Sequence, residues 1–222
     1  FFASGFAALL YQMVWQRLLT FWSGADLYAV TLIVAAYMAG LGFGSLAGGH
    51  LADRLGSGGR YLAFVLAETA VAAFALSSRT LLYDTLYLRL GERALPAAMV
   101  AVVLFLCLLW PTFFMGLSLP LLARIVTDRP EASAERIGGL YGWNTLGAAT
   151  GALASMWVLV RLLGFAGAIH VGAAINAACA LGALLLWALG RRRGSRSPAR
   201  PSAARDVEAP VTAVEERRLP LA

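Results

Sequence analysis

Six long apolar stretches, separated by short breaks, set the strongest limit on what this chain can fold into. They cover about residues 1–23, 27–49, 60–80, 97–124, 137–162 and 166–190. A helix needs about 20 apolar residues to cross the roughly 30 Å hydrocarbon core of a bilayer. The chain is 60% hydrophobic and 14% charged, whereas soluble domains average about 45–50% and about 25%. The sequence therefore predicts an all-α integral membrane protein, a six-helix bundle.

Two segments do not fit the pattern of spans. Residues 191–222 are rich in Arg, Pro, Ser and Ala and lack apolar periodicity, which predicts a disordered tail or linker after a six-span membrane domain at 1–190. Segment 81–96 carries leucines four residues apart with charged residues between them. That spacing predicts a short amphipathic helix at the membrane interface.

Arginine placement predicts the orientation, because cytoplasmic loops carry an excess of basic residues. The loops at 50–60 and 125–136, with Arg124, hold five arginines, and the opposite side holds four. The cluster between Arg191 and Arg200 raises the first number to ten. Both termini and the 50–60 loop are therefore expected in the cytoplasm, with the chain in the plasma membrane.

Charge and cysteine content remove several classes of function. The net charge is +6 and every basic residue is Arg, but these residues form no basic, aromatic face, so no nucleic acid partner is expected. Cys107 and Cys179 lie inside apolar stretches, where thiols are usually small hydrophobic residues. Neither cysteines nor histidines have the spacing of a metal site, so no metal or cofactor is expected in this chain.

The break after the second apolar stretch is short, charged and rich in glycine. Gly49 and Gly56 are expected to permit a sharp reversal of the chain. Asp53 and Arg54 would lie at the cytoplasmic ends of two helices, where Asp53 can pair with an arginine or cap a helix N-terminus. In a transporter that rocks between states, such a contact holds one state. The alternative is a solvated hairpin without a functional role.

Polar residues inside the apolar stretches are the candidates for a binding site or pathway. Glu68 lies deep in the third stretch, where a carboxylate is costly unless it is paired or protonated. It is a functional candidate, or else a hydrogen-bonded packing residue. Arg17 can line a polar interior or extend its side chain outward to the headgroups. The candidates that would share one polar interior are Tyr11, Gln12, Trp15, Arg17, Glu68 and Asn144.

Glycines recur every fourth residue in two of the predicted spans. Gly40, Gly44 and Gly48 lie on one face of the second span, and Gly147 and Gly151 repeat the spacing in the fifth. Small residues at this spacing let membrane helices approach closely. We expect both glycine stripes to be sites of close helix packing.

Four ordered segments together resemble the pattern of one known family. Ser4–Leu19 resembles its first-span pattern S-G-x-x-A-L-x-Y-E-x-x-W-x-R-L-L, and Leu41–Arg54 resembles its second span and loop. Pro111–Leu122 is similar to P-T-x-x-M-G-x-x-L-P-L-L, and Gly139–Ala148 is similar to x-L-Y-x-x-N-T-x-G-A. Together the matches extend over about residues 4–190, and the family that they resemble is the fused major facilitator (MFS)/spermidine-synthase-like membrane proteins of bacteria.

This resemblance implies a fold like one half of an MFS transporter, built of two three-helix repeats. It also implies a bacterial inner-membrane location and a link to polyamine chemistry. The sequence departs from the pattern at Gln12, where the family has Glu. Nothing in 191–222 supplies the nucleotide-binding loop or the acidic polyamine site of the family's soluble domain.

Three functions remain open. The first is the membrane module of a spermidine-synthase-like protein, anchoring or serving an aminopropyltransferase domain that is not in this chain and that acts in cis or in trans. The second is a transporter half that forms a homodimer to move a small solute. The third is a non-catalytic assembly subunit. In each, the lipid bilayer is the first partner, and no residue of this chain is expected to be catalytic.

Overall fold

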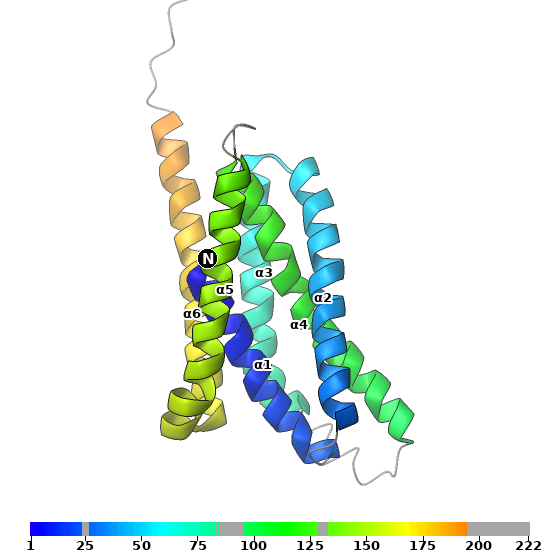
Figure 1. Ribbon diagram of the computed structural model, residues 1–222. Coiled ribbons are helices and arrows are strands. Elements are labelled where there is room, and N and C mark those ends of the chain that lie inside the picture. The colour runs from blue at the N-terminus through cyan, green and yellow to red at the C-terminus, as the bar shows by residue number, and fades with distance from the viewer. Residues whose placement is uncertain (24–26, 83, 85–95, 128–132, 195–222) are drawn as a thin grey trace, which may run out of the picture.

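The structure is a computed structural model, and it describes residues 1–23, 27–82, 84, 96–127 and 133–194. These residues form a bundle of long helices without a β-strand among them. Figure 1 shows α2, α3, α5 and the long part of α6 running roughly parallel and α1 and α4 inclined to them, with the N-terminus about halfway along the bundle. The predicted all-α class is therefore confirmed. The 85–95 part of the predicted interfacial helix and the 195–222 part of the predicted tail lie outside the described residues.

The helices follow one another with short connections. Their bounds are α1 Phe2–Ser23, α2 Leu27–Arg54, α3 Ser57–Ser78, α4 Ala97–Val126, α5 Ser133–Ala154, the π-helix η3 Ser155–Leu159 and α6 Val160–Gly194.

Four stretches of the described chain are long and apolar enough to cross a membrane. They are Val30–Arg54, Ser57–Leu82, Ala98–Val126 and Ala134–Arg192. The chain is thus a membrane protein by length and composition of its helices. Helix α1 is not among these stretches, and α5, η3 and α6 count as one stretch. The predicted number of six spans is therefore not confirmed and stays a prediction.

A glycine interrupts the last stretch where a break between two spans was predicted. Gly164 has φ +69° and ψ 178°, a backbone conformation outside the helical region, and it is the positive-φ glycine of the described residues. L-residues with a Cβ rarely adopt this φ, so glycine is required here. The chain changes direction at this point, between η3 and the long part of α6.

The charged turn between α2 and α3 is shorter than predicted. Gly49 through Arg54 continue α2, and α3 already begins at Ser57, which leaves Leu55 and Gly56 between the helices. The prediction that Gly49 permits the reversal is wrong, since Gly49 is helical. Gly56 does lie at the reversal, but its φ of −68° is one that any residue adopts. The prediction placed the turn where the apolar stretch ends, but α2 extends beyond that stretch to Arg54.

Helix contacts follow a pattern that repeats between the two halves of the chain. The most extensive contacts join α2 to α4, α1 to α5, α3 to α6, α3 to α4 and α1 to α6. If each α-helix is replaced by the α-helix three places away in the chain, the same pairs result. The α2–α4 contact then corresponds to the α5–α1 contact, and the α3–α4 contact to the α6–α1 contact. The smaller contacts of α4 with α5 and of α1 with α2 also exchange with each other. The contacts made by α1–α3 therefore correspond, pair by pair, to those made by α4–α6.

Glycines bring α2 and α4 together at the largest of these contacts. The stripe of Gly40, Gly44 and Gly48 was predicted to pack closely against a neighbouring helix, and that helix is α4. A Cβ on Gly116 of α4 would lie 2.5 Å from the carbonyl oxygen of Leu41 and 3.0 Å from the Cα of Gly44. Because these neighbours are backbone atoms, any side chain here would force the two helices apart.

The second predicted glycine stripe occupies the matching contact between α5 and α1. A Cβ on Gly147 would collide with the backbone of Phe2, and one on Gly151 with the backbone of Phe6. Both predictions of close packing are thus confirmed. The two glycine contacts also correspond to each other, because α5 matches α2 and α1 matches α4 in the repeated pattern of helix contacts.

Candidate functional site: a polar cavity between the helices

A cavity of about 220 Å³ lies inside the bundle. Since a water molecule occupies about 30 Å³, this volume is suited to several waters or one small solute. Phe1 and Ser4 line it, so it lies about halfway along the bundle in Figure 1. Each of the six α-helices contributes to the lining. The polar lining side chains are Ser4, Tyr37, Ser45, Glu68, Ser118, Tyr141, Asn144 and Asn176.

Glu68 is the acidic side chain of the cavity lining. It is 2% exposed, and three neighbouring helices donate hydrogen bonds to its carboxyl group. The hydroxyls of Ser4 and Ser118 donate to Oε1 over 2.8 Å and 3.3 Å, and the amide Nδ2 of Asn176 donates to Oε2 over 2.6 Å. All three partners are neutral. An acidic group at this depth costs several kcal/mol to insert into a membrane, so these bonds offset part of that cost.

The hydrogen bonds continue from Glu68 into α1. The hydroxyl of Tyr11 donates to Oδ1 of Asn176 over 2.9 Å. The ring of Tyr11 stacks on Trp15, with the centroids 5.3 Å apart and the planes 9° apart. The Nε1 donor of Trp15 is buried and has no hydrogen-bond partner in the described part of the chain. Asn176 therefore links two residues predicted to share one interior, Tyr11 and Glu68.

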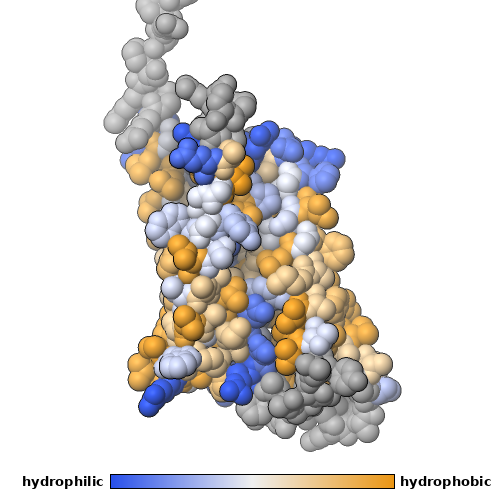
Figure 2. Space-filling model, viewed as in Figure 1, coloured by the Kyte–Doolittle hydropathy of each residue, from blue (hydrophilic) through white to orange (hydrophobic). Residues whose placement is uncertain are grey.

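The other predicted site residues divide into two groups. Asn144 lines the cavity and lies against α1, where its Oδ1 is 2.7 Å from the position that a Cβ on Gly5 would take. Gln12 is half-buried and Arg17 is exposed, and neither lines the cavity. Figure 2 shows a hydrophilic stripe over the lower part of α1, the helix that carries Gln12, Gln16 and Arg17. The structure thus brings Tyr11, Glu68 and Asn144 to the cavity region and leaves Gln12 and Arg17 on the surface of α1.

Three residues that bond to Glu68 were missed in the sequence. Asn176 is an amide in the middle of an apolar stretch, and the rule that selected Asn144 would have selected it as well. Ser4 and Ser118 carried no such signal, because a serine in a membrane helix commonly bonds to a carbonyl of its own helix. Ser118 does this too, with the carbonyl oxygen of Phe114 3.5 Å from its hydroxyl.

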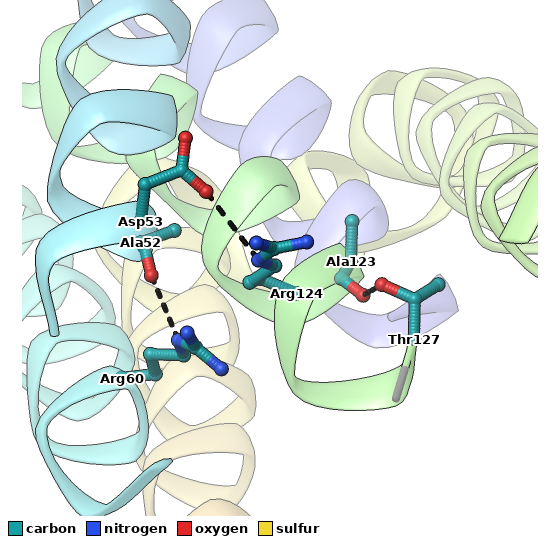
Figure 3. A network of polar contacts seen from close by, with 6 residues as sticks. All are labelled: Ala52, Asp53, Arg60, Ala123, Arg124 and Thr127. Carbon is teal, nitrogen blue, oxygen red and sulfur yellow. Dashed lines mark hydrogen bonds and ion pairs between the residues drawn. The ribbon is translucent and has the colours of Figure 1, made fainter. Parts of the chain in front are cut away.

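The charged turn forms a second polar site at one end of the bundle. Asp53 at the end of α2 pairs with Arg124 at the end of α4, with Oδ1 and Nε 3.4 Å apart, as Figure 3 shows. Nε of Arg60 donates to the carbonyl oxygen of Ala52 over 2.8 Å and so closes the turn between α2 and α3. The prediction that Asp53 pairs with an arginine is confirmed. Arg54 and Gly56 are exposed beside this pair.

No family model, curated protein or solved structure matches this chain. The fold and the site define a class, a helical protein with stretches long and apolar enough to cross a membrane and with a polar cavity whose described lining includes the carboxyl group of Glu68. The resemblance to the MFS/spermidine-synthase-like family stays a prediction from the four sequence segments.

Proposed function

We propose that this chain is a membrane module that binds a small cationic solute at Glu68, in the manner of one half of an MFS transporter. The observation that carries the proposal is the Glu68 carboxyl group, which is buried beside the cavity with only neutral partners among the described residues. A cation that enters can replace the serine donors and neutralise the carboxylate. Tyr37 and Tyr141 add aromatic rings to the lining, which also favours a cation.

Two features support the comparison with a transporter half. The helix contacts repeat between α1–α3 and α4–α6, as expected for two three-helix repeats. The hydrophilic stripe along α1 is poorly suited to lipid, and a second bundle would cover it. A homodimer supplies that second bundle, and six spans in each copy would give the usual twelve.

The arginines support an orientation with the α2–α3 turn in the cytoplasm of a bacterial inner membrane. Among the described side chains, the end with this turn carries more arginines than the other end, which supports the positive-inside assignment. The arginines at the turn end are Arg54, Arg60, Arg124, Arg136, Arg191 and Arg192, and those at the opposite end are Arg17, Arg79 and Arg161. The end of α6 that carries Arg191 and Arg192 would lie on the same, cytoplasmic side.

Uptake into proteoliposomes tests the proposal. We expect the protein to take up putrescine, a small diamine, and not 1,4-butanediol, its uncharged counterpart of similar length. Glu68→Gln keeps the size of the side chain and removes the charge, so it should reduce uptake at least about tenfold, equivalent to 1.4 kcal/mol. Glu135→Gln is the matched control, because Glu135 is exposed in the first turn of α5. Equal uptake by both variants, or no uptake by the parent protein, contradicts the proposal.

A second candidate is the membrane module of an aminopropyltransferase. The cavity favours it, because all four segments that carry the family resemblance contribute lining residues. Ser4 comes from the first segment, Ser45 from the second, Ser118 from the third and Asn144 from the fourth. In this case the cavity would supply or remove an amine for a cytoplasmic enzyme domain.

The gene tests this second candidate. It predicts that the reading frame continues past Ala222 into an aminopropyltransferase-like domain, or that a neighbouring gene encodes one. A stop codon there without such a neighbour rules out both the fused and the paired form. The proposal that the cavity binds a cation would then remain only in its transporter form.

A further inference from the structure

A second pocket opens between α3 and α6 at the end of the bundle that carries the α2–α3 turn. Its volume is about 550 Å³. The lining residues used below are Ser57, Gly58 and Tyr61 at the start of α3, and Leu186, Trp187 and Arg191 near the end of α6. We call it the α3–α6 pocket. It is separate from the Glu68 cavity and shares no lining residue with it.

The polar groups of the α3–α6 pocket are all able to donate hydrogen bonds. They are the hydroxyls of Ser57 and Tyr61, the indole Nε1 of Trp187 and the guanidinium of Arg191. None of them makes a hydrogen bond or ion pair to another described residue. The guanidinium lies over the Trp187 ring, 5.1 Å from its centroid, which holds the charge at the pocket. Among the residues that the structure describes, no acidic side chain lines it, so the pocket has the chemistry of an anion receptor.

The pocket lies at the ends of two stretches that are long and apolar enough to cross a membrane. The stretch Ser57–Leu82 begins at the pocket and Ala134–Arg192 ends there, and Figure 2 shows this end of the molecule as hydrophilic. Tryptophan and tyrosine are enriched at the headgroup level. Leu186 lines the same pocket and is 63% exposed, so the apolar side of the pocket is open to the bilayer.

We propose that the α3–α6 pocket binds one anionic phospholipid, with its phosphate at Arg191 and Tyr61 and an acyl chain along Leu186. An arginine can hold a phosphate through two hydrogen bonds, and the exposed leucine favours a lipid over a free phosphate ester. Gly58 keeps room for this arrangement, since a Cβ there would lie 3.0 Å from Nε1 of Trp187.

Native mass spectrometry of the purified protein tests this site with dioleoylphosphatidylglycerol and dioleoylphosphatidylcholine. One basic residue near the surface contributes about 1 kcal/mol to binding an anionic lipid. We therefore expect about a fivefold preference for the first bound phosphatidylglycerol. Arg191→Gln should abolish this preference, and Tyr61→Phe should reduce it. Arg192→Gln is the matched control, because it removes the same charge one residue away and does not line the pocket.

Three results would overturn the proposal. The first is a parent protein without preference between the two lipids. The second is an equal loss in Arg191→Gln and Arg192→Gln, which would indicate diffuse basic charge instead of a pocket. The third is displacement of the lipid by millimolar glycerol 3-phosphate, which would make a soluble phosphate ester the ligand. Equal melting temperatures of the two arginine variants ensure that folding does not explain a difference.

Discussion

Gly116→Ala should destabilise the bundle through the contact between α2 and α4. The new Cβ would lie 2.5 Å from the carbonyl oxygen of Leu41, whereas ordinary contact begins at 3.4 Å. The helices would have to separate by about 0.9 Å, the difference of these two distances. Overpacking of this kind costs about 1–3 kcal/mol. For a chain of this size, that loss lowers the melting temperature by about 2–12 °C.

Thermal unfolding of the purified protein in detergent measures this effect, and Gly42→Ala is its control. Gly42 lies on α2, one of the same two helices, but no atom of another described helix lies within 4 Å of a Cβ placed there. Alanine is a better helix former than glycine by up to about 1 kcal/mol, so the control should melt at the parent temperature or slightly above it. If both variants melt alike, the α2–α4 contact is not as close as described and the reasoning is wrong.

Three further substitutions test the polar groups. Asn176→Leu removes a donor to Glu68 and leaves its buried Oε2 without a partner, which should lower the unfolding free energy by about 1–3 kcal/mol. Ser118→Ala removes the longer 3.3 Å bond and should cost less, and the reverse order in chemical denaturation would contradict this geometry. Asp53→Asn should change stability by less than about 1 kcal/mol, because the side chains of Asp53 and Arg124 are 70% and 52% exposed. A loss of several kcal/mol would mean that the pair is shielded from solvent.

The sequence predicted the helices because apolar length is a strong signal in a membrane protein. It was less accurate at helix ends. Residues from Gly49 to Arg54 are, apart from Leu51, polar or small, yet they continue α2 for more than a turn. Hydropathy reports where the chain leaves the lipid, while the backbone hydrogen bonds of a helix continue into the headgroup region. The predicted loop was therefore too long and its glycine at position 49 was given the wrong role.

The candidate site was only partly predictable. Glu68 was selected because an ionisable group in an apolar stretch is costly, and Tyr11 because it lies among polar neighbours in α1. The bond that joins them runs through Asn176, which is 108 residues from Glu68. No local pattern reveals such a pairing, because it depends on α6 packing between α1 and α3. The repeat of helix contacts was visible in the residues only as the two glycine stripes, because close approach of two helices requires small residues whereas other contacts accept many side chains.

The central claim is that Glu68 gives a cavity open to solutes a preference for cations. The most direct test is the reactivity of a cavity thiol, placed by Ala148→Cys after replacing Cys107 and Cys179 with serine. Its reaction rates are measured with methanethiosulfonates that carry an ammonium or a sulfonate group. Glu68→Gln should lower the ratio of the two rates by about tenfold, since charge-assisted contacts contribute about 1.5–3 kcal/mol. An unchanged ratio, or a thiol that reacts with neither reagent, would contradict the account.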